Sequence, residues 1–203
     1  MTRLTRAESQ AKTRAVLIST ARDLFLADGY AQTSLERVAE SAGFSKGAVY
    51  SNFKSKKELS LEVLDLIHTS KFAEVAELLS APGSIEDRLD QFQAWAEKTL
   101  GDVGWTMLEF ELFVTARDDE ELRAALVSAL GIVRGMVVGL LESTTASIGV
   151  TLPMPVEDAA SSLLSLGIGL GIQRAMDPSI SARLVTDGLR TLLNYAEAVQ
   201  ALA

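Results

Sequence analysis

Apolar residues recur every three or four positions along most of the chain, which is the pattern of amphipathic α-helices. The pattern predicts helices at about residues 6–27, 34–42, 46–52, 56–79, 84–101, 104–115, 119–147, 156–175 and 179–201. All four prolines fall between these segments, as expected because proline cannot continue a helix interior. No run alternates in the manner of a strand. We therefore predict an all-α fold without internal repeats.

The first predicted helix and the two short helices after it form one group. A buried stripe on the first helix is predicted from Ala15, Ile18, Ala21, Leu24 and Phe25. Gly43 permits a sharp turn between the two short helices, as in a helix-turn-helix. The angle between those helices would be fixed by apolar contacts from Val38, Ala39, Phe44, Val49 and Phe53.

Charge is distributed unevenly between the two ends of the chain. The formal net charge is −8, yet residues 1–60 hold ten Lys/Arg against six Asp/Glu, a net of +4. Residues 61–203 hold nine against twenty-one, a net of −12. The basic end can approach phosphates while the acidic end is repelled by them. This split indicates an oriented DNA-binding protein rather than a general nucleic-acid coat protein.

Composition excludes several kinds of chemistry and suggests a location. The chain has no cysteine, which excludes disulfides, thiolate metal sites and cysteine nucleophiles. No metal or cofactor is implied. The first 14 residues lack an apolar signal-peptide core, and the longest charge-free apolar stretch, residues 159–173, is shorter than the ~20 residues of a membrane span. We expect a cytoplasmic protein that does not contact membrane.

The residues left outside the helix-turn-helix core are rich in donors for phosphates and base edges. They are Ser45, Lys46, Gly47, Tyr50, Ser51, Asn52, Lys54 and Lys56. The order and spacing of residues 12–65 resemble the TetR family of bacterial repressors. The matching residues are Ala21, Leu24, Phe25, Gly29, Tyr30, Thr33, Ser34, Val38, Ala39, Ala42 to Gly47, Tyr50, Asn52 to Lys56 and Leu59, with Asn52 where many members carry His.

The resemblance implies a role for each residue at this end. Lys46, Gly47 and Tyr50 would lie on a recognition helix in the major groove of double-stranded DNA. Phosphates would be held by Thr33, Ser45, Tyr50, Asn52 and Lys56, with Ser34, Ser51 and Lys54 beside them. We therefore predict a DNA-binding domain at residues 1–55 and a ligand-binding and dimerisation domain at residues 56–203, in a repressor released by a small-molecule inducer.

The larger domain offers candidates for both of its predicted tasks. The family binds its inducer between middle helices, and large or polar side chains on apolar faces suggest His68, Phe72, Trp95, Trp105, Met107, Phe110, Glu111 and Met136. Each of these is also compatible with an ordinary core or surface position. The last two helices are predicted to pair with those of a second copy through Leu163, Leu166, Leu170, Leu184, Leu189 and Leu192. Such a homodimer would place its recognition helices one DNA turn apart on a palindrome.

Two rival functions remain open on the sequence. An enzyme, for example a helical hydrolase, has little support because the chain has one histidine and no Gly-x-Ser-x-Gly elbow. We therefore predict that it is not an enzyme. A helix-turn-helix that contacts protein is the other rival, and the lysines around it argue against that function. Salt-dependent binding to duplex DNA would separate the three.

Overall fold

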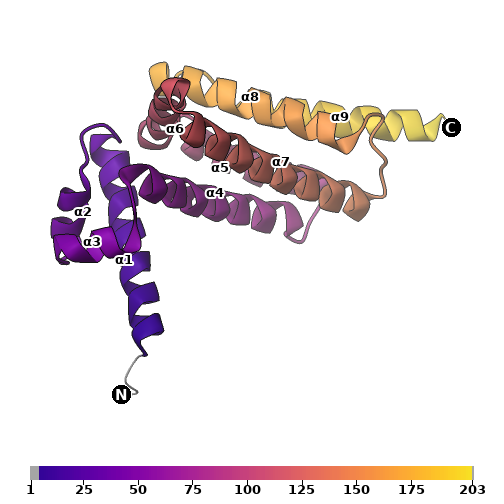
Figure 1. Cartoon of the computed structure of the whole chain (residues 1–203). Helices are drawn as coiled ribbons and strands as arrows, with labels where there is room; N and C mark the ends of the chain where they lie inside the picture. The colour runs from indigo at the N-terminus through magenta and orange to yellow at the C-terminus, as the bar shows by residue number, and fades with distance from the viewer. Residues whose placement is uncertain (1–4, 203) are drawn as a thin grey trace. The chain divides into compact units, whose positions relative to one another are not determined.

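The computed structural model describes residues 5–202, which form nine α-helices, one short 3-10 helix and no strand (Figure 1). This confirms the predicted all-α fold. The helices are α1 (Arg6–Asp28), α2 (Leu35–Ser41), α3 (Lys46–Asn52), α4 (Lys56–Ser80), α5 (Ile85–Thr99), α6 (Val103–Thr115), η1 (Ala116–Asp118), α7 (Glu120–Ile148), α8 (Val156–Met176) and α9 (Arg183–Ala201).

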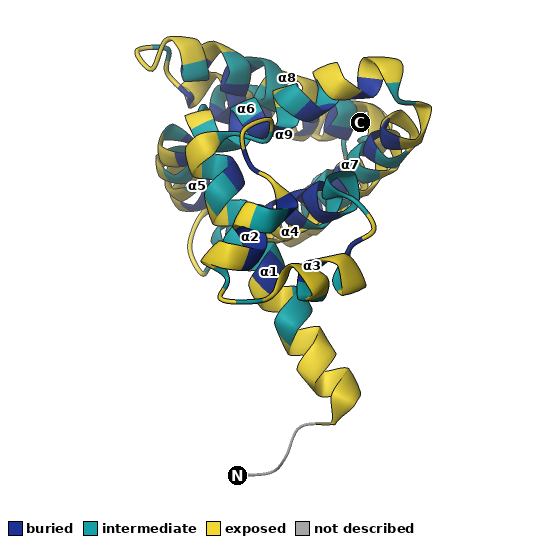
Figure 2. Ribbon diagram, turned by 60° about the vertical axis from the view of Figure 1, so that its left-hand side comes forward, coloured by how far each residue is buried: buried dark blue, intermediate teal, exposed yellow. Residues whose placement is uncertain are grey.

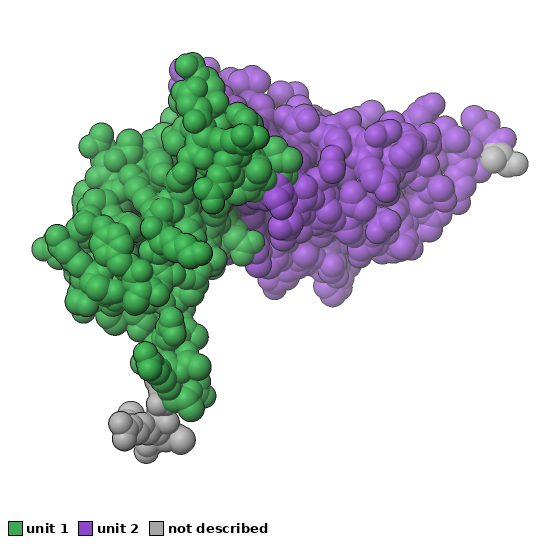
Figure 3. All heavy atoms as spheres, in the orientation of Figure 1, with its two compact units in different colours: residues 1–67, 103–127 green, residues 68–102, 128–203 purple. Residues whose placement is uncertain are grey.

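The chain divides into two compact units, coloured separately in Figure 3. Unit 1 comprises residues 1–67 and 103–127, and unit 2 comprises residues 68–102 and 128–203. Helices α4 and α7 are each divided between the two units, α4 after residue 67 and α7 after residue 127. The units therefore divide the chain differently from the predicted domains, because α6 and the start of α7 belong with the helix-turn-helix.

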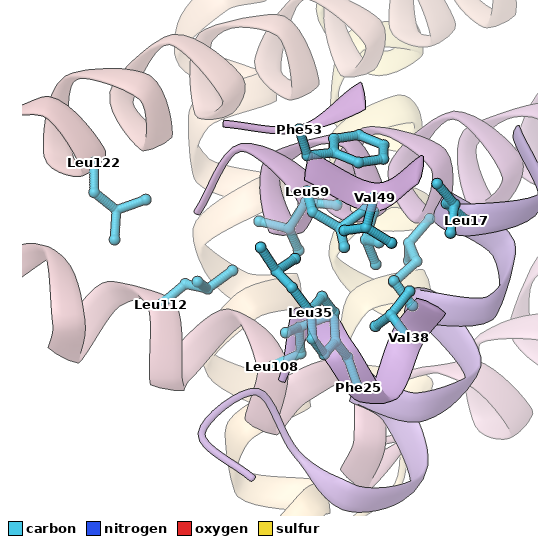
Figure 4. Packing of buried hydrophobic residues seen from close by; sticks show 14 of the residues in the cluster. Leu17, Phe25, Leu35, Val38, Val49, Phe53, Leu59, Leu108, Leu112 and Leu122 are labelled. Atoms are coloured by element: carbon cyan, nitrogen blue, oxygen red, sulfur yellow. The ribbon is translucent and has the colours of Figure 1, made fainter. Parts of the chain in front are cut away.

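The core of unit 1 is built by α1, α2, α3, α6 and the first parts of α4 and α7. Leu17, Phe25, Val38, Leu59 and Leu108 are among its buried side chains (Figure 4). The buried stripe of α1 is Leu17, Ala21 and Phe25, spaced by four residues. The prediction for this stripe was wrong at Ala15, which is exposed, and it missed Leu17. Several faces of α1 carry apolar residues, so spacing alone did not select one.

Close contact between α1 and α6 depends on Gly104. A Cβ atom at this position would lie 2.5 Å from the carbonyl oxygen of Leu26 and 3.1 Å from its Cα. Because both contacts are with backbone, no side-chain rotation would relieve them. Glycine at the start of α6 therefore lets this helix approach α1 closely enough to bury Leu108 and Leu112.

Unit 2 has two clusters of buried apolar residues that share α5, α8 and α9. Arg174 on α8 is buried among them and donates to the carbonyl oxygens of Glu97, Leu100 and Ile180. Helix α9 begins at Arg183, four residues later than predicted. The cause is a local turn in which the Asp177 carboxylate accepts from the backbone and hydroxyl of Ser179.

The length and composition of α7 do not agree with the expectation that no segment is long and apolar enough to cross a membrane. Among the residues that the structure describes, it alone is long and apolar enough to do so, by length and composition only. Arg134 interrupts the apolar residues of α7, so this helix contains no charge-free stretch long enough to span a membrane. Length and composition are weak grounds, since a core helix of a soluble protein can pass the same test.

Candidate nucleic-acid interface

Helices α2 and α3 form a helix-turn-helix whose ends are fixed by serine caps. The Ser34 hydroxyl accepts from the backbone N–H of Arg37 at 3.1 Å, and the Ser45 hydroxyl accepts from Ala48 at 3.2 Å. Between the helices Gly43 adopts a φ of 72°, a left-handed conformation that favours glycine. The backbone N–H of Phe44 then donates to the carbonyl of Ala39 at 2.9 Å, which closes the turn.

One face of this motif is buried, which leaves the other face of α3 outward. Val38, Ala39, Val49 and Phe53 are buried in the unit 1 core, as the sequence predicted, and Phe44 packs against it half-buried. The exposed positions of α3 appear in yellow in Figure 2. They are Lys46, Gly47, Tyr50 and Ser51.

Arg14 on α1 holds the end of α3 and was missed by the sequence analysis. Its guanidinium lies 4.3 Å from the centre of the Phe53 ring and donates to the carbonyl oxygen of Asn52 at 2.6 Å. A second nitrogen donates to the Glu62 carboxylate on α4 at 2.8 Å. One cation therefore joins α1, α3 and α4. Arg14 lies four helical turns before Gly29, so no local motif indicated this contact.

Several predicted phosphate-binding side chains already have partners within the protein. The Asn52 amide donates to the carbonyl of Ala48 at 2.7 Å, and the Ser51 hydroxyl donates to the same carbonyl at 2.9 Å. Thr33 is buried and its hydroxyl donates to the carbonyl of Gly29. Thr33 therefore lies in the interior and shapes the loop before α2, whereas Lys46 and Lys54 lie at the surface.

The loop between α1 and α2 is held from two sides. The Lys56 ammonium lies 4.1 Å from the centre of the Tyr30 ring and donates to the carbonyl of Ala31 at 3.3 Å. Partial burial lowers the pKa of Lys56. The Glu111 carboxylate on α6 accepts from the backbone N–H of Ala31 at 2.8 Å. Glu111, predicted as a ligand contact, therefore faces the helix-turn-helix.

A further ion pair within unit 1 joins α4 to the residue before α7. Lys57 at the start of α4 pairs with Asp119, which immediately precedes α7. The hydrogen bond between them raises the pKa of Lys57 and lowers that of Asp119. Together with Glu111, this pair connects α6 and the start of α7 to the loop before α2 and to α4.

The predicted ligand contacts fall in both units. Trp105, Met107, Phe110 and Glu111 lie on α6 in unit 1, and Phe110 is exposed. The others lie in unit 2, namely His68, Phe72, Trp95 and Met136. Within unit 2 the Trp95 indole donates to the Glu74 carboxylate at 2.7 Å and stacks on Phe92 with ring centres 5.7 Å apart. Glu74 was not in the predicted set.

Some of the predicted dimer contacts are exposed or half-buried, and others are buried within unit 2. Leu166 on α8 and Leu184 on α9 are exposed, and Leu163 and Leu192 are half-buried. Leu170 and Leu189, in contrast, are buried in the core of unit 2 and contribute nothing to an outer surface. Tyr195 on α9 is an exposed residue that the predicted set lacked.

Comparison with known proteins agrees with this geometry. A family model described as "Bacterial regulatory proteins, tetR family" matches residues 17–63, the segment that holds α2 and α3. The probable transcriptional regulator ArpR of Pseudomonas putida is 39% identical over 90 residues, and the transcriptional regulator TtgR of P. putida is 38% identical over 90. Each alignment covers 44% of this chain and 40% of the relative.

Solved structures resemble the chain over most of its length. A TetR-family regulator from Mesorhizobium loti matches with a TM-score of 0.72 and 21% identity, covering 97% of this chain and 98% of that one. NalD of Pseudomonas aeruginosa, described as a secondary repressor of a multidrug efflux pump, matches with a TM-score of 0.57 and 25% identity, over 92% and 98% of the two chains.

The described residues form an all-α fold whose helix-turn-helix lies within the segment that this family model matches. Residues 17–63 match the TetR family model, and the relatives aligned with this chain are transcriptional regulators, in agreement with the predicted resemblance. The prediction that it is not an enzyme agrees with the names of these relatives, which are transcriptional regulators.

Proposed function

We propose that this chain is a ligand-responsive transcriptional repressor. It binds a palindromic operator in double-stranded DNA as a homodimer and is released by a small-molecule inducer in the cytoplasm. The observation that carries the proposal is the outward face of α3, where Lys46, Gly47 and Tyr50 are exposed above a buried layer of Val38, Val49 and Phe53. A recognition helix needs this combination of a fixed backbone and outward donors.

Selection of bound duplexes from a random-sequence pool, at two salt concentrations, tests this function. Counterion release makes binding to DNA weaken steeply as salt rises. We expect an enriched palindrome with half-sites about one DNA turn apart, roughly 34–36 Å. A pool without enrichment at either salt concentration would contradict DNA readout and favour a helix-turn-helix that contacts protein.

The two exposed lysines should act differently on DNA. Lys46, the first residue of α3, is positioned for a base edge, and Lys46→Ala should relax the sequence preference of the enriched site. Lys54 follows α3 and is positioned for a phosphate. Lys54→Ala should weaken binding to all duplexes alike and lower the salt slope by about 1.

Lys56→Ala provides the comparison for these two variants. Its ammonium is engaged with Ala31 and Tyr30, so its loss should also disturb the loop before α2. Binding isotherms on the selected site and on a scrambled duplex would measure all three. If Lys46→Ala kept the full preference of the parent, the proposed contact would be wrong.

The homodimer is proposed to form through α8 and α9. These helices pack together, with the Leu166 side chain 3.3 Å from where a Cβ of Gly188 would lie, and they present Leu166 and Leu184 outward. Leu184→Glu should convert the dimer to monomer, because a carboxylate buried at an interface lacks a partner. Sedimentation velocity measures the change.

Val114→Glu on α6 is the matched control for that substitution. Val114 is exposed to a similar extent, 59% against 53% for Leu184, but lies in unit 1. The control should sediment like the parent. A Leu184→Glu protein that also sedimented like the parent would exclude this interface.

Regulation is proposed to pass from the larger domain to the helix-turn-helix through α4, α6 and α7. Inducer binding would favour a conformation that fits DNA poorly. Support comes from two contacts inside unit 1, the hydrogen bond from Ala31 to Glu111 and the ion pair of Lys57 with Asp119. The first joins α6 to the loop before α2 and the second joins the start of α7 to α4, so a shift of α6 or α7 would disturb these contacts.

A further inference from the structure

The carboxylate of Glu36 lies at the tip of the Tyr50 side chain. Tyr50 projects from α3 with 53% of its surface exposed, and its hydroxyl donates to Glu36 Oε1 at 2.7 Å. Glu36 belongs to the first turn of α2. The sequence analysis assigned Tyr50 to DNA and left Glu36 out. The structure therefore adds an acid to the surface proposed to meet DNA.

Charge and hydrogen bonding both keep this acid ionised. The hydrogen bond from Tyr50 lowers the pKa of Glu36, and the positive charge of Lys46 lowers it further. The same hydrogen bond raises the pKa of Tyr50. At neutral pH the pair therefore consists of a carboxylate and a phenol that keeps its proton.

The hydrogen bond to Glu36 restricts which groups Tyr50 can contact, because it uses the only proton of the Tyr50 hydroxyl. A phenolic hydroxyl has one proton to donate, and here it is directed to a carboxylate, which is a strong acceptor. Tyr50 and Glu36 consequently offer only oxygen lone pairs to an outside partner. DNA phosphates carry negative oxygens that accept, so they gain nothing from this pair. In the major groove the available donors are the exocyclic amino groups of cytosine and adenine.

We propose that Glu36 is a specificity-determining residue, which together with Tyr50 forms one acceptor site for the amino group of a cytosine or adenine in each operator half-site. The inference rests on the proposed DNA-binding function and assigns Tyr50 to a base rather than to a phosphate. Lys46, on the same outward surface of α3, supplies a hydrogen-bond donor for the acceptors guanine O6 and N7. The three side chains would therefore read donors and acceptors side by side.

Glu36→Gln tests the proposal because it keeps the size of the side chain and removes its charge. The glutamine amide can donate to the Tyr50 oxygen, which releases the Tyr50 proton for a phosphate. Parent and variant would be compared by duplex selection and by isotherms on single-base variants of the selected site. At one base pair per half-site we expect the variant to lose tenfold or more of the parent's preference for cytosine or adenine. Its binding to mismatched duplexes should equal or exceed that of the parent.

Two further variants separate this role from a structural one. Glu40→Gln makes the same change at an exposed glutamate of α2 and should leave every base preference intact. Tyr50→Phe should lose the preference at the same base pair, and the double variant Glu36→Gln/Tyr50→Phe should lose no more than either single variant. Thermal unfolding would verify that all of these proteins fold like the parent.

The outcomes distinguish failure of this inference from failure of the function on which it rests. If the parent enriches a palindrome and Glu36→Gln keeps the same preference at every position, Glu36 does not determine specificity and the proposal is overturned. If the parent enriches no sequence at either salt concentration, the DNA-binding function itself is overturned.

Discussion

Gly104→Ala should destabilise the protein by about 3 kcal/mol, the upper end of the usual cost of overpacking. The added methyl would lie 2.5 Å from the carbonyl oxygen of Leu26, so α6 would have to move away from α1. That movement would expose Leu108 and Leu112, which are fully buried. For a chain of this length the midpoint of thermal unfolding should fall by roughly 6–12 °C.

Gly135→Ala on α7 is the matched control. It makes the same change within a helix, but nothing lies within 4 Å of the new Cβ atom. Alanine should therefore raise stability by up to about 1 kcal/mol through its higher helix propensity. Differential scanning calorimetry would compare the two variants with the parent. Equal unfolding temperatures for Gly104→Ala and the parent would mean that α1 and α6 do not approach as closely as described.

Arg174→Met should lower the free energy of unfolding by about 1–3 kcal/mol, the range for leaving a buried hydrogen-bonding group without its partner. The guanidinium donates at 2.8 Å to the carbonyls of Leu100 and Glu97, and it pairs with the Glu97 carboxylate at 2.9 Å. It also donates to the carbonyl of Ile180. Methionine fills similar space but leaves these acceptors without a donor, which is the costly case. Urea unfolding followed by circular dichroism measures the loss.

Arg190→Met is the control within the same unit. Arg190 pairs with Glu86, Asp90 and Asp187, and its side chain is more accessible than that of Arg174. Ion pairs at the surface contribute at most about 1 kcal/mol. Similar losses of unfolding free energy for the two variants would show that the burial of Arg174 does not determine how much it stabilises the protein.

Sequence reasoning located the helices well because each one carries its own signals. The helical bounds of α3 agree with the prediction, and Ser34 and Ser45 cap α2 and α3. The late start of α9 was not foreseen, because the Asp177–Ser179 turn can be read equally well as the first turn of a helix. Local hydrogen bonding decided between the two.

Within the candidate site, sequence reasoning identified the outward residues of α3 but not what holds them. Arg14, Glu36 and Glu111 have no distinguishing neighbours in the sequence, and their partners lie 38, 14 and 80 residues away. Leu170 and Leu189 were predicted at a surface because a leucine stripe looks alike whether it faces its own core or another copy.

The sequence by itself determined the all-α fold, the helix-turn-helix and the outward residues of α3, because helical periodicity, serine caps and the Gly43 turn act over a few residues. The tertiary structure alone decided which charged groups meet. Arg14 contacts the end of α3, Glu36 accepts a hydrogen bond from Tyr50, Glu111 holds the loop before α2, and Arg174 binds carbonyls at the end of α5. A long charged side chain contacts whatever packing brings within its reach, and packing is a property of the whole chain.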